Sequence, residues 1–124
     1  MCEVGRIRRL LEKDRGRFVR RVYREAEIAY CDARRKPEIH YAARFAAKEA
    51  FLKALGRGWR LGWTQIEVVR TASGKPDLLL TGKAAEAAAR RGVRQVHLTL
   101  THTADTAAAL IVLEGNHGGG KERI

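Results

Sequence analysis

The sequence predicts an α+β fold in which helices pack on a mainly antiparallel sheet. Apolar residues recur at helical spacing in the first half of the chain, and they alternate with polar residues through most of the second half. One alanine-rich segment, 82–91, is helical in character and interrupts the alternating part. With 124 residues the chain is long enough for one domain with one modest core.

Three helices are expected in the first half of the chain. They cover about residues 4–14, 25–33 and 37–55. The run Asp14-Arg15-Gly16 is expected to end the first helix, and Gly56 is the natural C-terminal glycine of the third. Pro37 is suited to the first turn of that third helix.

Strands are expected where the hydrophobic period changes to two. They cover about residues 66–68, 77–80, 96–100 and 107–113. The last of them is apolar at every position, so we expect it to be buried on both faces. Turns are expected at 73–76 and 103–106.

The charge of the chain predicts an anionic partner. The net charge is +11, and eight arginines and Lys13 lie between Arg6 and Arg24 against two acidic residues. Nucleic acid, an anionic membrane, a phosphorylated small molecule or an acidic protein would each suit such a surface. The arginine-rich segment is either a solvated helix face or a docking face.

The remaining bulk features predict a cytoplasmic protein without a membrane partner. No apolar run is long enough to span a bilayer, and the first residues lack the apolar core of a signal peptide. Cys2 and Cys31 are expected to be free thiols. The glycine-rich tail, 116–124, is expected to be disordered.

The segment 44–56 carries the strongest candidates for chemistry. On a helix, Glu49 falls in the apolar stripe of Phe45 and Leu52, where an uncompensated carboxylate is costly. Glu49 is therefore a metal ligand or general base, or else either a residue at the rim of the core or one paired with Lys53. Arg44 and Lys48 share another face, where they either hold phosphate oxygens or face solvent.

His102 is a second candidate. It ends the core-facing row of the strand at 96–100, as either a structural or a functional histidine. No nucleophile motif of a protease and no zinc-binding motif accompanies it.

The segment 44–56 closely resembles the signature helix of the holo-acyl-carrier-protein synthases, the small phosphopantetheinyl transferases of fatty-acid biosynthesis. Other matches follow in family order, and the resemblance spans about residues 3–115. They are Glu3-Val4-Gly5-Arg6-Ile7, Arg17-Phe18, 27–31, Ile66-Glu67-Val68, Gly74-Lys75-Pro76 and Thr101-His102-Thr103.

The resemblance implies a 4'-phosphopantetheinyl transferase fold in a single domain over residues 1–115. It also implies an activity: a serine hydroxyl of acyl carrier protein attacks the β-phosphate of coenzyme A, the phosphopantetheine arm is transferred, and 3',5'-ADP leaves. The family uses magnesium and works as a homotrimer with its sites at subunit interfaces.

The resemblance also implies roles for individual residues. Glu49 matches the magnesium-binding glutamate that helps to activate the serine, and Lys53 matches a catalytic lysine near the pyrophosphate. Residues expected to contact coenzyme A are Arg44, Lys48, Lys53, Gly74, Lys75, Pro76, His102 and Thr103, with the run 34–36 within reach of the 3'-phosphate. Arg6, Arg17 and Arg21 match basic residues that grip the carrier protein.

The start of the chain departs from the family pattern. The family begins with a strand of the form G-I-D-I-x-E, whose aspartate is a second magnesium ligand. Glu3 aligns with the glutamate of that motif, which places the aspartate just before Met1, so we expect the strand and this ligand to be missing and the activity to be impaired. Either the true start lies upstream, or the chain is a shortened and weaker enzyme.

Two other functions stay open at this point. The charge and the arginine-rich start suit a nucleic-acid-binding module, but residues 1–24 offer only Phe18 and Tyr23 for base stacking, so we expect no nucleic-acid partner. The missing aspartate leaves room for an inactive scaffold that binds carrier protein without turnover.

Overall fold

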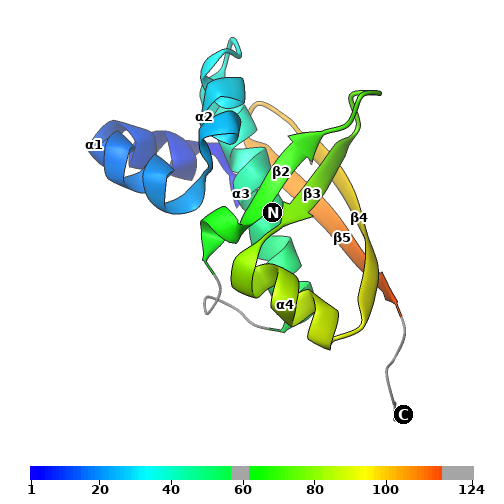
Figure 1. The fold of residues 1–124 in the computed structure, drawn as a ribbon. Coiled ribbons are helices and arrows are strands. Elements are labelled where there is room, and N and C mark those ends of the chain that lie inside the picture. Colours follow the sequence, from blue (N-terminus) through cyan, green and yellow to red (C-terminus); the bar gives the residue numbers. More distant parts are fainter. Residues whose placement is uncertain (57–61, 116–124) are drawn as a thin grey trace.

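The computed structural model describes residues 1–56 and 62–115, and Figure 1 shows its arrangement. The elements follow one another as β1 (Cys2–Glu3), α1 (Val4–Val22), α2 (Glu25–Asp32), α3 (Pro37–Leu55), β2 (Ile66–Arg70), β3 (Pro76–Leu80), α4 (Gly82–Arg90), β4 (Val93–His102) and β5 (Thr106–Gly115), with a short 3-10 turn at Trp63–Gln65. The predicted tail, 116–124, lies outside the described residues.

The strands form two antiparallel sheets. One has the order β1-β5-β4, and the other pairs β2 with β3. Helix α3 runs through the middle of the molecule and packs mainly against β5, and α4 lies at one end of the strands (Figure 1). The predicted α+β class and the mainly antiparallel pairing are confirmed.

Helix α1 extends beyond its predicted end. Asp14 leaves the helical conformation, with φ −155° and ψ 72°, so the break was predicted correctly. The chain then resumes a helix to Val22, because the Asp14 carboxylate accepts the backbone N–H of Arg17 at 3.4 Å and caps the new segment. Burial of Val19 and Val22 stabilises this second segment against the core.

Two predictions about strands need correction. The expected absence of a first strand is wrong, because Cys2 and Glu3 form β1 opposite Ala107 and Thr106 of β5. Strand β5 is buried on one face only: within this chain Leu110 is 63% exposed. Val112, on the same face, is 49% exposed.

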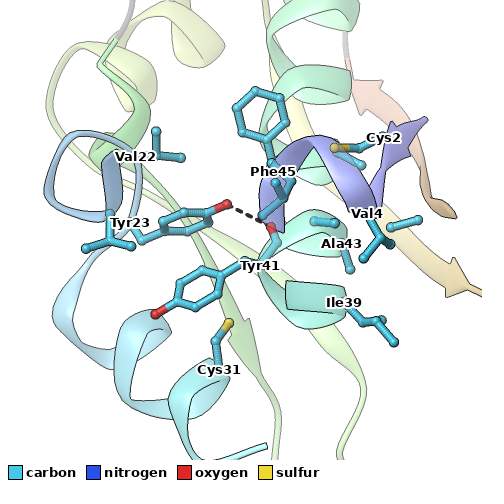
Figure 2. Close-up of a cluster of buried hydrophobic side chains, with 14 residues drawn as sticks. Cys2, Val4, Val22, Tyr23, Cys31, Ile39, Tyr41, Ala43 and Phe45 are labelled. Carbon is cyan, nitrogen blue, oxygen red and sulfur yellow. Dashed lines mark hydrogen bonds between the residues drawn. The ribbon is translucent and has the colours of Figure 1, made fainter. Parts of the chain in front are cut away.

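The largest core cluster joins the two segments of α1 to α2, α3 and the β1–β5 pair. Its centre is aromatic: the rings of Tyr23 and Tyr41 meet edge to face, with centroids 4.8 Å apart (Figure 2). The Tyr23 hydroxyl donates a hydrogen bond to the Tyr41 carbonyl at 2.8 Å. This cluster fixes the orientation of α3, which carries most of the candidate site residues.

The left-handed conformation at the end of α3 is supplied by Gly56, with φ +81°. Its N–H closes the helix on the Leu52 carbonyl, as the sequence predicts. Over residues 1–56 and 62–115, no helix is long and apolar enough to cross a membrane.

Candidate functional site

Glu49 lies on the part of α3 that faces the start of the chain. It is partly buried, and its charge acts on the thiol of Cys2 in β1. Burial raises the pKa of that thiol, the Arg6 guanidinium lowers it, and Glu49 raises it. Glu49 and Arg6 therefore both lie close enough to β1 to act on the charge of the Cys2 thiol.

A group of arginines gathers around one aromatic ring on α2. The guanidinium carbons of Arg44, Arg34 and Arg70 lie 4.2, 4.5 and 5.0 Å from the centroid of the Tyr30 ring. We call these four residues the Tyr30 cluster. In the described part of the chain, none of its arginines forms an ion pair with a carboxylate.

Arg44 is the buried member of the Tyr30 cluster. It is 3% exposed, and its Nε has no hydrogen-bond partner among the described residues. A buried guanidinium with an unused donor is costly unless an anionic acceptor completes it. The alternative that Arg44 faces solvent is therefore wrong, and its environment suits a phosphate-binding arginine.

Two histidines lie beside the Tyr30 cluster. The His40 ring lies 5.8 Å from the Tyr30 ring and 5.8 Å from the ring of His102 at the end of β4. The pKa of His40 is lowered, first by burial and then by the charges of Arg44, His102, Arg34 and Arg70. A hollow of about 730 Å³ opens beside these groups. It is lined by Ala33, Arg34, Arg35, Lys36, Ile39 and His40.

The turn at 74–76 is tied to the same cluster. Gly74 adopts φ +87°, which favours glycine, and its carbonyl accepts a hydrogen bond from the Arg70 guanidinium. Lys75 and the Gly74 backbone are exposed. Arg70 thus connects the predicted nucleotide turn with Tyr30 on α2.

Thr103 lies directly after β4 and is exposed beside His102. Its hydroxyl accepts the backbone N–H groups of Asp105 and Thr106 at 3.2 and 3.1 Å. Thr103 therefore shapes the turn between β4 and β5.

The assignment of Lys48 to coenzyme A binding needs correction. Its side chain is fully buried, and its ammonium donates to Glu27 Oε1, the Val22 carbonyl and the Trp63 carbonyl at 2.7, 2.8 and 3.1 Å. All three donors of the ammonium are used inside the protein. Neither alternative from the sequence, phosphate contact or solvent exposure, fits this environment.

The other predicted residues are exposed. Lys53 lies one turn after Glu49, near the end of α3. Arg6, Arg17 and Arg21 are exposed on α1, with Arg6 placed 5.9 Å from the Phe45 ring centroid and Arg17 paired with Asp14 at 3.4 Å.

Tyr30, His40 and Arg70 were not singled out from the sequence. Only the spacing of Tyr30 and Arg34, four residues apart at the end of a predicted helix, hinted at a contact. Arg70 reaches the ring from β2, about forty residues further along the chain, and no local pattern signals that.

Comparison with known proteins places these features in a family. A family model described as the 4'-phosphopantetheinyl transferase superfamily matches residues 2–110. A holo-[acyl-carrier-protein] synthase of Anaeromyxobacter sp. (strain K) is 52% identical over 118 residues, 93% of this chain and 91% of the relative. Another, from Solibacter usitatus, is 46% identical over 116 residues, which cover 92% of this chain and 93% of the relative.

Solved structures agree. The holo-[acyl-carrier-protein] synthase of Neisseria meningitidis superposes with a TM-score of 0.83 at 32% identity, over 91% of this chain and 92% of the other. A Bacillus anthracis synthase, crystallised in complex with CoA (3',5'-ADP), gives 0.73 at 30% identity, over 92% of this chain and 90% of the other. The chain therefore belongs to the 4'-phosphopantetheinyl transferase superfamily, among the holo-[acyl-carrier-protein] synthases.

Proposed function

We propose that the chain transfers 4'-phosphopantetheine from coenzyme A to a serine of acyl carrier protein, in fatty-acid biosynthesis in the cytoplasm, with residues 1–115 as one transferase domain. The observation that carries this proposal is the Tyr30 cluster, whose arginines have no carboxylate partners in the described chain and include the buried Arg44. A phosphorylated ligand supplies the missing acceptors. Glu49 lies on the same helix, one turn and one residue beyond Arg44.

The bonds of the reaction balance without a further reactant. The serine oxygen forms a bond to the β-phosphorus, and the bond from that phosphorus to the oxygen bridging the two phosphates breaks. 3',5'-ADP leaves with the bridging oxygen, and the serine proton passes to a base. Glu49 is the partly buried carboxylate on α3 that we assign to this activation.

We assign the remaining roles to the neighbouring side chains. Arg44 and His102 bind phosphate oxygens, Thr103 shapes the adjoining turn, and the turn 74–76 faces the nucleotide. Lys53, exposed near Glu49, reaches the pyrophosphate. These groups neutralise and orient the leaving nucleotide.

Magnesium in this proposal is held by one carboxylate of the chain together with the phosphates of coenzyme A. No group of three His, Cys, Asp or Glu side chains that could hold a metal occurs in residues 1–56 and 62–115, and we assign Glu49 as the protein ligand. Mg²⁺ commonly binds through one or two carboxylates together with substrate phosphates and water. When bound, it would offset the charge of the pyrophosphate.

Carrier protein is the second substrate, and α1 is its docking surface in this proposal. Arg6, Arg17 and Arg21 are exposed there, within an arginine-rich helix. Exposed guanidinium groups suit an acidic partner helix through charge attraction.

A homotrimer completes the proposed assembly. The outer face of β5 exposes Leu110 and Val112, opposite Thr99 and His97 of β4. Burial of this face against neighbouring copies accounts for its apolar composition.

The test of the function is transfer from coenzyme A to apo acyl carrier protein with magnesium, followed by mass spectrometry. Glu49→Gln keeps the shape of the side chain and removes its charge, so we expect a rate loss of about a hundred-fold or more. Glu86→Gln, which changes an exposed glutamate on α4, is the matched control and should retain full activity.

Transfer by Glu49→Gln at the wild-type rate would refute the assignment of this residue. A wild-type chain that binds carrier protein and adds no arm would instead favour the inactive scaffold.

A further inference from the structure

Three arginine side chains contact the aromatic ring of Tyr30. Arg34 follows α2, Arg44 belongs to α3, and Arg70 ends β2, yet all three guanidinium carbons lie within 5.0 Å of the Tyr30 centroid. Like charges this close repel one another. The negative face of an aromatic ring attracts guanidinium groups and lowers the cost of assembling them.

The ring of Tyr30, rather than its hydroxyl, makes these contacts. The Tyr30 side chain is partly buried against the main core cluster, which limits its motion. Its hydroxyl has no hydrogen-bond partner among the residues that the structure describes. Phenylalanine at this position would therefore keep the contacts with the arginines, whereas an aliphatic side chain would lose them.

One member of the cluster, Arg34, lies at a hollow that is rich in cationic side chains. Arg34 lines the hollow beside His40, together with Arg35 and Lys36. A terminal phosphate near neutral pH carries close to two negative charges and three strong acceptor oxygens. It can therefore engage several guanidinium groups at once.

We propose that Tyr30 is a positioning residue of the nucleotide site, whose ring gathers Arg34, Arg44 and Arg70 to receive the 3'-phosphate of coenzyme A. The inference rests on the proposed function for the identity of the nucleotide. It assigns Tyr30 no contact with the reacting atoms. Its effect is to hold three cations ready before the ligand arrives.

Binding of 3',5'-ADP and of 5'-ADP, measured by calorimetry, separates this role from general packing. Tyr30→Leu should weaken 3',5'-ADP about ten-fold, or about 1.4 kcal/mol, because the cation–π contacts are lost. It should weaken 5'-ADP no more than about two-fold, because that ligand lacks the 3'-phosphate. Tyr30→Phe should bind both like the wild type.

Phe18→Leu is the matched control. Phe18 is also a partly buried aromatic residue of the main core cluster, and its ring contacts Tyr23 rather than an arginine of the Tyr30 cluster. It should leave both affinities unchanged, and thermal denaturation of each variant reports whether the fold is intact.

Several results would overturn the inference. They are wild-type affinity in Tyr30→Leu, equal losses for both nucleotides, a loss in Tyr30→Phe as large as in Tyr30→Leu, or no binding of 3',5'-ADP by the wild-type chain. A wild-type chain that shows the expected binding pattern and yet transfers no arm would refute the proposed function and leave the role of Tyr30 standing.

Discussion

Lys48 and Glu27 form a fully buried ion pair at the centre of the molecule. Glu27 Oε1 also accepts the backbone N–H of Arg24 at 2.9 Å, and Oε2 accepts that of Val68 at 3.0 Å. Burial lowers the pKa of Lys48, and Glu27 opposes this by favouring the charged form. The pair connects α2, α3 and β2. It stabilises the fold only when both charges are present, because either charge alone would be buried without a partner.

Removal of either charge of the Lys48–Glu27 pair should therefore lower the stability of the fold. Lys48→Met is expected to lower the free energy of unfolding by about 3–5 kcal/mol, because it leaves the Glu27 carboxylate buried without a counter-charge. Urea denaturation at one fixed protein concentration measures the change. Lys83→Met, at an exposed position of α4, should change stability by less than about 0.5 kcal/mol. A similar small effect for Lys48→Met would contradict the structural role.

At the scale of elements, α1 is two helical segments joined at Asp14. Arg15, directly after the joint, donates to the Asp32 carboxylate and to the Tyr41 hydroxyl, and the Tyr41 hydroxyl donates to Asp32 at 2.8 Å. This group fixes the second segment, which carries Arg17 and Arg21, to α2 and α3. The local sequence predicts the break because Asp14-Arg15-Gly16 is a stop signal, but the resumption depends on partners such as Asp32 that lie far along the chain.

Charge reversal on α1 tests the carrier-docking surface. Arg6→Glu or Arg21→Glu should weaken carrier binding about ten-fold, since each replaces an attraction between exposed charges with a repulsion. Coenzyme A affinity should stay unchanged, and carrier affinity of the wild type should fall with added salt. Arg90→Glu, an exposed reversal on α4, is the control for net charge.

Calorimetric titration with acyl carrier protein at two salt concentrations gives the comparison. If carrier affinity changes neither with charge reversal on α1 nor with added salt, this docking surface is ruled out.

At the scale of the whole molecule, periodicity predicts most of the fold and less of the site. Helices α2, α3 and α4 and the alternating strands follow from hydrophobic spacing, and Gly56 ends α3 as expected. The Tyr30 cluster was not predictable in this way because its arginines come from the turn after α2, from α3 and from β2. Lys48 was misassigned because helical spacing gives the face of a residue but not the depth of its burial.

The exposed apolar face of β5 allows a test of the proposed trimer. Leu110→Asp places a charge on that face, where the leucine is 63% exposed in the single chain. If three copies bury it, the variant should dissociate to monomers, because an unpaired buried charge is strongly unfavourable. Light scattering coupled to size exclusion measures the mass. Ala89→Asp, at an exposed position of α4, should leave the trimer intact, and a monomeric wild type would contradict the assembly.

The Lys48–Glu27 pair also constrains how the sequence can drift over generations. A natural domain has only about 5–15 kcal/mol of net stability, so losing one charge of a buried pair consumes a large part of it. Replacement of both residues by apolar side chains of similar volume is often neutral or stabilising. A sequence with apolar residues at both positions can be reached only through one that has lost a single charge, and selection removes that less stable protein. Lys48 and Glu27 are therefore expected to change together or to stay as they are.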